Sequence, residues 1–442
     1  MQTLKDLERS QWCLSSPLHN RLAEEDRPVH AWYRFVLSFP PHLVREYLSK
    51  FGVAPGAVVL DPFCGTGTTI VECKKQGIGA VGFEANPMAA LASRVKTNWL
   101  IGGPELGCVA AWAAEKAQSE IDTVFAPRRM PTGAGVREQL NIYGWLSLDQ
   151  DAEKLLLANS ISPKPLHRAL VLLQWINRSD SEFVEPLQLA LAWTLVVHAG
   201  NIRFGPEVGI TKPKDDCDVV GLWLEQCKRM AADLAEFSER KQIHTQLIQA
   251  DSRDVSQLAD NSISAVFTSP PYPNEKDYTR TTRLESVVLG LVKNKSDLRA
   301  LKEGLLRSNT RNVYVADKDD AFVADIPEIQ RIAAEIEAKR VEMGKDSGFE
   351  RLYHRVTKLY FGGMARHLQS LQPKLKPGAM LGYVVGDQAS YLQIQIKTGQ
   401  LLAEIAERQG YEVVSIDLFR TRMATATRQQ LREEVVVLRW PG

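Results

Sequence analysis

The stretch AVVLDPFCGTGTTIVECKKQG, residues 57–77, holds a short β-rich run, then a glycine and threonine turn, then a helical pattern from about Thr68. The next stretch, residues 78–99, repeats this order, with a strand ending at Glu84 and a helix from Pro87, a residue suited to a first helical turn. Strands that alternate with helices indicate a parallel sheet covered by helices. The fold class predicted from these residues is therefore α/β.

The rest of the chain interrupts this pattern and then completes it. Between Asn98 and about Thr245 the sequence predicts helices. The elements expected after them are strands at 245–251 and 262–269, a polar and mostly helical stretch at 291–345, a helix near 350–370, a strand at 379–387, a helix near 396–409, and strands at 411–419 and 434–440. Two consecutive strands after the final helix predict an antiparallel hairpin at the sheet edge, which an all-parallel nucleotide-binding sheet lacks.

The composition limits the kinds of partner, metal site and membrane role that the chain can have. The 442 residues are 44% hydrophobic and 24% charged, as in soluble globular proteins, and the formal net charge is +1. A polyanionic partner must therefore be met by local patches. The six cysteines form no C-x-x-C pair and the eight histidines no H-x-x-x-H cluster, so we expect reduced thiols, no metal and a cytosolic setting. The longest apolar stretch, residues 187–200, is too short to span a bilayer and predicts a buried helix.

The turn DPFCGTGTT, residues 61–69, has the chemistry of a ligand loop. It carries G-x-G at Gly65 and Gly67 but no third glycine, which alone is a weak signal. Glu84 follows Gly67 by 17 positions, where it could accept both hydroxyls of an adenosine ribose, as in a dinucleotide site. Asp61, directly before the glycines, suits a ligand with a cationic ammonium rather than a pyrophosphate.

The stretch TSPPY, residues 268–272, follows the apolar run SISAVF. It resembles the catalytic motif of the S-adenosylmethionine-dependent amino-methyltransferases of DNA, which implies that its target is the exocyclic amine of a nucleobase. Such an amine is a poor nucleophile because its lone pair is delocalised into the ring. Hydrogen bonds from the amine to the Pro270 carbonyl and the Ser269 side chain would draw the nitrogen toward tetrahedral geometry, and the prolines would keep these acceptors preorganised. Tyr272 offers a stacking face for a flipped base. Taken alone, the stretch is better explained as a rigid turn that ends a strand.

Together the two motifs resemble the S-adenosylmethionine-dependent amino-methyltransferases of DNA, over roughly 39–97, 246–285 and 370–440. The resemblance implies a doubly wound, seven-stranded methyltransferase sheet, S-adenosylmethionine as methyl donor and S-adenosylhomocysteine as product. It implies that Glu84 holds the ribose, and that Asp251 takes the adenine amine with Ser252 adjacent. The residues it assigns to the cofactor are Phe39, Pro40, Asp61, Pro62, Phe63, Cys64, Gly65, Thr66, Gly67, Thr68, Thr69, Glu84, Asp251, Ser252 and Thr268, and those it assigns to catalysis are Ser269, Pro270, Pro271 and Tyr272.

The preferred product is N4-methylcytosine in DNA, because Ser269 stands where adenine-modifying relatives more often carry Asp or Asn. An N6-adenine or RNA-amine methyltransferase is the alternative within enzymes, since the same acceptors suit any planar exocyclic amine. A non-catalytic DNA-binding subunit is the alternative of another class, although it would be expected to lose Ser269, Pro270 or the glycines. A dinucleotide oxidoreductase is opposed by the missing third glycine. The resemblance also implies DNA as partner, a cognate restriction endonuclease or defence system as a candidate partner, and a prokaryotic cytoplasm, with the nucleoid, as location.

The resemblance divides the chain into five segments. These are 1–97 with the cofactor-binding half, 98–245 as a helical insertion that is a candidate for target recognition, 246–290 with the catalytic loop, 291–348 as a second helical insertion, and 349–442 with the remaining strands.

Phosphate contacts are expected where positive charge gathers locally. Residues 98–245 carry 19 acidic and 15 basic side chains, whereas 270–315 carry five acidic and nine basic ones and the Arg-rich turn 418–432 has four arginines and no acid. The candidates are Lys276, Arg280, Arg311, Arg420, Arg422 and Arg428, with Arg203, Lys212 and Lys214 on a loop expected between two helices at 201–214. A solvated charged face, or a plain connector for the loop, is the alternative. Asp387, at the end of a strand, is a candidate for the target pocket.

Overall fold

The computed structural model describes residues 22–33, 38–125, 144–205, 207–274, 276–423 and 430–442. Among these residues the central sheet has seven strands in the order β5-β2-β1-β6-β7-β9-β8. Their bounds are β1 Val58–Asp61, β2 Gly79–Phe83, β5 Thr245–Ile248, β6 Ile263–Thr268, β7 Leu375–Gly386, β8 Glu412–Met423 and β9 Gln430–Arg439. The first five strands in this order, β5, β2, β1, β6 and β7, pair in parallel with their neighbours. Strand β9 runs antiparallel to both β7 and β8. The predicted α/β sheet with a terminal antiparallel hairpin is confirmed.

The turns after β1 and β2 lead each of these strands directly into a helix. Gly67 adopts the left-handed conformation with φ of 87° and is the N-cap of α4 (Thr68–Lys75). A Cβ at Gly67 would also meet the Ser93 hydroxyl at 2.9 Å, so only glycine fits this turn. Helix α5 (Pro87–Thr97) starts where the Asn86 side chain accepts a hydrogen bond from the Met88 N–H. Helix α3 (Pro41–Lys50) packs on α4.

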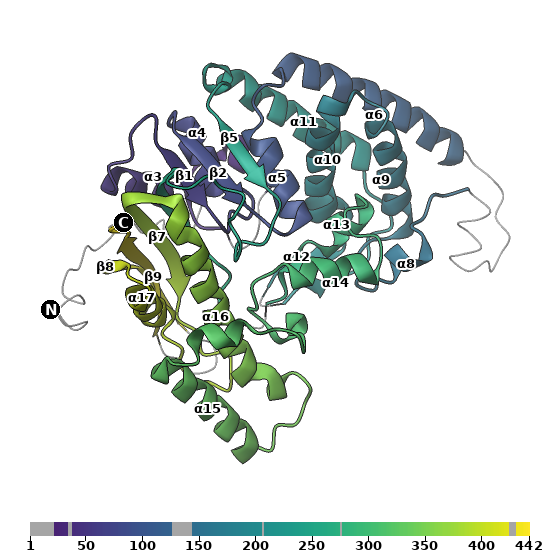
Figure 1. Ribbon diagram of the computed structural model, residues 1–442. Coiled ribbons are helices and arrows are strands. Elements are labelled where there is room, and N and C mark those ends of the chain that lie inside the picture. Colours follow the sequence, from purple (N-terminus) through teal and green to yellow (C-terminus); the bar gives the residue numbers. More distant parts are fainter. Residues whose placement is uncertain (1–21, 34–37, 126–143, 206, 275, 424–429) are drawn as a thin grey trace.

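The residues between β2 and β5 form a mainly helical unit beside the sheet (Figure 1). Its helices are α6 Gly103–Phe125, α8 Gln150–Glu153, α9 Pro163–Ile176, α10 Ser181–Thr194 and α11 Val219–Glu236. All of these helices except α8 share a core around Leu106, Leu187 and Trp223, which continues to Met88 and Leu91 of α5. The apolar stretch 187–200 is the end of α10 and a π-helical turn, Leu195–Ala199, as predicted for a buried helix. No helix of the described ranges is long and apolar enough to cross a membrane.

The second insertion and the C-terminal helices follow β6. Their bounds are α12 Tyr278–Thr281, α13 Arg283–Val288, α14 Lys295–Glu303, α15 Pro327–Glu342, α16 Tyr353–Leu371 and α17 Thr398–Arg408, with short 3-10 helices η4 at Thr310–Asn312 and η5 at Asp319–Val323. Helix α15 packs on α16, and Figure 1 shows it at the far end of the molecule from the first insertion.

Two local predictions were wrong. The loop predicted at 201–214 contains a small antiparallel hairpin, with β3 (Ile202–Arg203) paired to β4 (Gly209–Ile210). The Arg-rich turn predicted at 418–432 is mostly strand, because β8 continues to Met423 and pairs with β9 through Arg422, opposite Leu431. Arg420 and Arg422 therefore belong to a strand, while Arg428 lies outside the described residues.

Candidate active site

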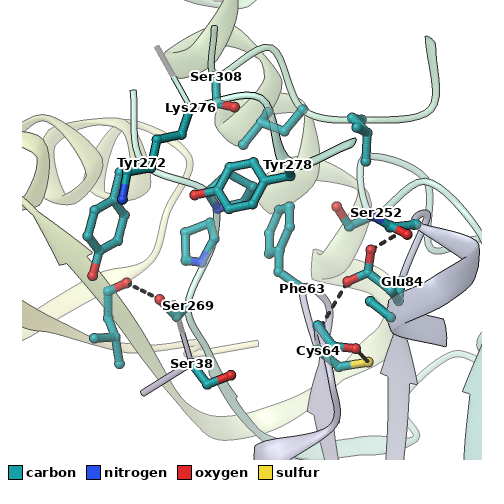
Figure 2. A pocket seen from close by; sticks show the side chains of 18 of the residues that line it. Ser38, Phe63, Cys64, Glu84, Ser252, Ser269, Tyr272, Lys276, Tyr278 and Ser308 are labelled. Carbon is teal, nitrogen blue, oxygen red and sulfur yellow. Dashed lines mark hydrogen bonds between the residues drawn. The ribbon is translucent and has the colours of Figure 1, made fainter. Parts of the chain in front are cut away.

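A cavity of about 630 Å³ lies at the carboxyl ends of the parallel strands, where α/β sheets bind ligands. Figure 2 shows Glu84 and Ser252 toward one end of it, Ser269 and Tyr272 toward the other, and Phe63 and Tyr278 between them. The predicted residues on its wall are Phe39, Pro62, Phe63, Cys64, Gly65, Thr66, Thr68, Glu84, Ser252, Ser269, Pro270, Pro271, Tyr272, Lys276, Arg420 and Arg422. The fold thus brings both predicted motifs into one cavity.

Glu84 is held against the glycine loop by two backbone N–H groups. Its Oε2 accepts from Gly65 at 2.9 Å and its Oε1 accepts from Asn86 at 2.7 Å. Burial raises the pKa of the carboxyl to about 7, although these backbone hydrogen bonds oppose the shift. The carboxylate is thereby fixed on the cavity wall next to the loop, with lone pairs left to accept ligand hydroxyls.

Asp61 lies beneath the loop instead of on the wall. It is fully buried, and its Oδ1 accepts hydrogen bonds from the Thr268 hydroxyl at 2.6 Å and from the Phe63 N–H at 3.2 Å. Burial raises the pKa of Asp61 to about 6. These contacts tie the glycine loop to the catalytic loop after β6. Contact of Asp61 with the cationic end of a ligand stays a prediction.

The end of the cavity at Glu84 and Ser252 is supported by a histidine that the sequence did not predict. Buried His367 on α16 bonds the Ser252 carbonyl through Nδ1 at 2.7 Å and the Tyr383 hydroxyl through Nε2 at 2.8 Å. Burial lowers the pKa of His367 to about 4, so the ring is neutral and Nδ1–H donates to the carbonyl while Nε2 accepts from Tyr383. Its ring also packs edge-on to Phe63, with centroids 5.1 Å apart. His367 therefore positions both Ser252 and Phe63.

Most of the remaining predicted cofactor residues are not on the cavity wall. Phe39 is on the wall and packs edge-on against Phe267, whereas Pro40 is the N-cap of α3. Thr69 donates a hydrogen bond to the Phe267 carbonyl. Gly67, Thr268 and Asp251 are also absent from the wall, while the neighbours of Asp251, Ala250 and Ser252, are on it.

The catalytic loop presents its acceptors to the cavity. The Ser269 hydroxyl donates to the Val384 carbonyl at 3.1 Å, so its hydrogen points away and its lone pairs remain to accept from a ligand. The Tyr272 ring lies over Gly386 at the end of β7. Burial raises the pKa of the Tyr272 phenol, an effect that nearby Glu433 increases, so the phenol is neutral at physiological pH. The arrangement can hold a planar ring that carries an amine.

Comparison with known proteins agrees with this geometry. Residues 5–93 match the family model of the N6/N4 methyltransferases, described as DNA methylase. The chain is 24% identical to the type II methyltransferase M.BsoBI of Geobacillus stearothermophilus, over 94% of this chain and 85% of that protein. It is 23% identical to the type II methyltransferase M.AvaI of Nostoc sp., over 100% of this chain and 92% of that protein. The type II methyltransferase M.MjaII of Methanocaldococcus jannaschii is 38% identical over 77 residues, 17% of this chain and 14% of that protein.

These matches support an amino-methyltransferase of the N6/N4 family. The predicted resemblance is thus confirmed, and with it an enzyme that methylates an exocyclic amine in DNA. Methyltransferases of this family use S-adenosylmethionine, and the cavity fits it: an acid stands beside a glycine turn, and aromatic rings line the wall between that acid and the amine acceptors. In the part of the chain that the structure describes, no group of His, Cys, Asp or Glu side chains could hold a metal ion.

The predicted phosphate-binding residues divide into those at the methyltransferase cavity and those away from it. Lys276, Arg420 and Arg422 are on the wall, the two arginines paired with the buried Glu433 at 2.5 and 3.4 Å. Arg311 is not on the wall, but it pairs at 3.7 Å with Glu207, which is, and so joins the two insertions beside the cavity. Several other cations of 270–315 are paired inside the protein, such as Lys302 with Asp277.

The others are not on the wall. Arg203 and Lys212 are exposed, and Lys214 donates to the carbonyls of His198 and Gly200. Arg280 on α12 and Asp387 after β7 are also away from the cavity. A structural role accounts for Lys214, and contact with DNA stays a prediction for the rest.

One side of the cavity is formed by residues that the sequence did not predict. Gly304, Leu305, Leu306, Ser308, Asn309 and Asn312, from the stretch after α14, line the cavity. The Asn309 side chain donates to the Lys276 carbonyl at 3.0 Å, and the Tyr391 hydroxyl donates to the Ser308 carbonyl at 3.1 Å. A polar stretch without periodicity carries no local signal of such a role. We refer to residues 304–312 as the cavity wall segment.

Proposed function

We propose that this chain is a type II methyltransferase that transfers a methyl group from S-adenosylmethionine to the N4 amine of cytosine in DNA, forming S-adenosylhomocysteine. The observation that carries the proposal is the single cavity in which Ser269, Pro270 and Tyr272 face the glycine loop and Glu84. A partner restriction endonuclease is part of the proposal, because the relatives are type II methyltransferases. Since the substrate is DNA, we place the enzyme with the nucleoid in a prokaryotic cytoplasm.

The chain's own groups would activate and hold the target amine. The Ser269 oxygen and the Pro270 carbonyl accept its two hydrogens, and the target ring stacks on Tyr272 after leaving the duplex. S-adenosylmethionine supplies an electrophilic methyl group on a sulfonium. Holding the two reactants in line can supply roughly 7–11 kcal/mol of the barrier, so the protein needs no covalent nucleophile. The amine becomes acidic as the methyl is transferred and loses its proton without a strong base.

At the other end of the cofactor, Glu84 would accept the ribose hydroxyls. Phe39 would pack against the adenine ring, and Ser252 would lie beside it. The residues of the glycine loop from Pro62 to Thr68 would surround the methionine part.

The cytosine assignment rests on Ser269. A hydroxyl is a neutral acceptor that can also donate, so it tolerates the ring nitrogen beside the cytosine amine, which a carboxylate would repel. Adenine has a ring nitrogen in the same relation to its amine, so the resemblance to cytosine-modifying relatives carries part of the weight.

The test is chemical identification of the product. Purified protein is incubated with DNA and cofactor labelled in the methyl group, and the digested nucleosides are separated and identified by mass spectrometry. We expect label in N4-methylcytosine. Label in N6-methyladenine would overturn the base assignment and leave the amine acceptors intact, whereas unlabelled DNA would contradict the catalytic proposal.

A further inference from the structure

Asp251, which the family resemblance assigns to the adenine amine, is engaged by its neighbour Arg253. Its Oδ1 accepts from the Arg253 backbone N–H at 2.9 Å and from Nε at 3.0 Å. Its Oδ2 accepts from Nη2 at 2.6 Å and from Nε at 3.0 Å. Both carboxylate oxygens therefore accept hydrogen bonds from one guanidinium.

Arg253 extends this contact into the second insertion. Its side chain is 5% exposed. Nη2 also donates to the Glu303 carbonyl at 3.0 Å, at the end of α14, and Nη1 donates to Asp319 Oδ2 at 2.6 Å, at the start of η5. Asp319 in turn pairs with Arg366 of α16 at 3.3 Å. The guanidinium thus joins the loop after β5 to the second insertion.

The two points that Arg253 holds bracket the cavity wall segment. Glu303 directly precedes Gly304, and Asp319 follows Asn312 by a few residues. Arg307, 3% exposed, closes the same segment by donating to the carbonyls of Lys302, Glu303 and Leu305 and to Asp317. The segment reaches the catalytic loop through Asn309 and Lys276. A change at Asp251 is therefore transmitted through Arg253 to a segment that runs from Gly304, beside Ala85, to Asn309, which bonds the catalytic loop at Lys276.

We propose that Asp251 is a positioning residue, which sets the cavity wall segment through Arg253 for the target base, and is not the hydrogen-bond acceptor of the cofactor's adenine amine. This inference rests on the proposed function, because it assigns the two halves of the cavity to cofactor and target. Its consequence is that losing Asp251 impairs the use of DNA more than the recognition of adenine.

The test compares S-adenosylhomocysteine with S-inosylhomocysteine, in which oxygen replaces the adenine amine. Calorimetry measures both affinities for the full-length wild type and for Asp251→Asn, Arg253→Met, Arg253→Lys and the double variant Asp251→Asn/Arg253→Met. We expect the ratio of the two affinities to stay within about twofold of wild type in every variant, as for sites that do not interact. An added variant, Asp251→Ala, leaves no acceptor at this position, and a ratio that collapses in it and not in Arg253→Met would show that Asp251 contacts the amine and would overturn the proposal.

Steady-state kinetics with DNA supplies the second readout. We expect Asp251→Asn and Arg253→Met each to lower kcat/KM for DNA by roughly 10- to 100-fold, the effect of misplacing part of a site. The double variant should be no worse than either single one, because both changes remove the same link. Arg253→Lys, which keeps one donor, should recover part of the loss. Additive effects of the two single changes would contradict a shared link.

Asp319→Asn gives an independent variant, since it loosens the far end of the link without touching Asp251. It should reproduce the loss in kcat/KM for DNA with unchanged affinity for both cofactor analogues. Normal kinetics in Asp319→Asn would contradict transmission through Arg253. If the wild type binds neither analogue, the proposed function itself fails, which is a different result from any of these.

Discussion

The ring of Tyr272 lies so close to Gly386 that a Cβ added at Gly386 would come within 2.9 Å of the ring. Tyr272 belongs to the catalytic loop after β6, and Gly386 is the last residue of β7. The glycine thus leaves the space in which the ring stands.

We expect Gly386→Ala to displace Tyr272 and to lower kcat by about 10- to 100-fold, because small misplacements of a stacking group are costly in methyl transfer. Cofactor affinity should be unchanged, since Glu84 lies toward the opposite end of the cavity from Tyr272. Single-turnover kinetics and calorimetry measure the two effects. Gly107→Ala on α6, where a Cβ meets nothing within 4 Å, is the matched control and should keep full activity. An equal loss in the control would point to a general effect on folding.

Binding and chemistry should separate at the catalytic loop. Ser269→Ala and Tyr272→Ala remove interactions with the target amine and ring, so we expect most methyl transfer to be lost while S-adenosylhomocysteine binds as before. Tyr272→Phe keeps the stacking face and should retain most activity. Full activity in both alanine variants would return the loop to a structural role.

Cofactor affinity should rise with pH through the pKa of Glu84. Burial raises this pKa from 4.5 to about 7 in the free protein, so the carboxyl is largely protonated below pH 7 and cannot accept from both ribose hydroxyls. Binding should therefore strengthen between about pH 6 and pH 8 and should release protons near pH 6. Glu84→Gln should weaken binding by roughly 1–3 kcal/mol and remove most of this pH dependence. Calorimetry in buffers of different ionisation enthalpy measures the proton release, and an unchanged pH profile in Glu84→Gln would contradict the assignment.

The stability of the free protein should change with pH in the opposite direction to the cofactor affinity. An acid whose pKa is raised on folding stabilises the folded state at pH values below the pKa that it has in the unfolded chain. For Glu84 this contribution is lost as the pH rises from about 4.5 to about 7. Asp61 and Glu285, whose pKa values burial raises to about 6 and about 7, act in the same direction. Through these three groups, the free protein should have a lower melting temperature at pH 8 than at pH 6. Saturating cofactor should reduce the difference.

DNA affinity should depend on salt through Arg420 and Arg422. Both line the cavity and their side chains are 27% and 38% exposed. Replacing both with alanine should reduce the slope of log K against log salt by about one to two, because up to two fewer phosphate contacts release counterions. Lys376→Ala, an exposed cation near the opposite end of β7, is the control and should leave the slope unchanged. An unchanged slope in the double variant would assign both arginines to the pairing with Glu433 alone.

The sheet and the ligand loops could be predicted because their signals are local. A β-rich run followed by a glycine turn and a helical pattern places Gly65 and Glu84 at strand ends, and two final strands predict the hairpin. The course of β8 through Arg420 could not be predicted, since a stretch rich in arginine and threonine reads as a turn and only pairing with β9 extends the strand. His367 and the cavity wall segment contribute through contacts between distant residues, and no spacing in the sequence records these. Asp251 and Arg253 are near neighbours in the sequence, but the contacts of Arg253 with Glu303 and Asp319 again join distant residues.

The pairing of Ala80 in β2 with Thr245 in β5 also has a consequence for biosynthesis. The ribosome delivers β5 only after the whole first insertion, so β2 presents an unpaired edge on that side of the nascent chain for as long as translation of the insertion lasts. Compaction of the insertion around Leu106 and Trp223 shortens the distance that β5 must cover, which lowers the entropic cost of completing the sheet. Changes in this helical core should therefore reduce the yield of soluble enzyme during rapid expression, even where they leave the purified enzyme fully active.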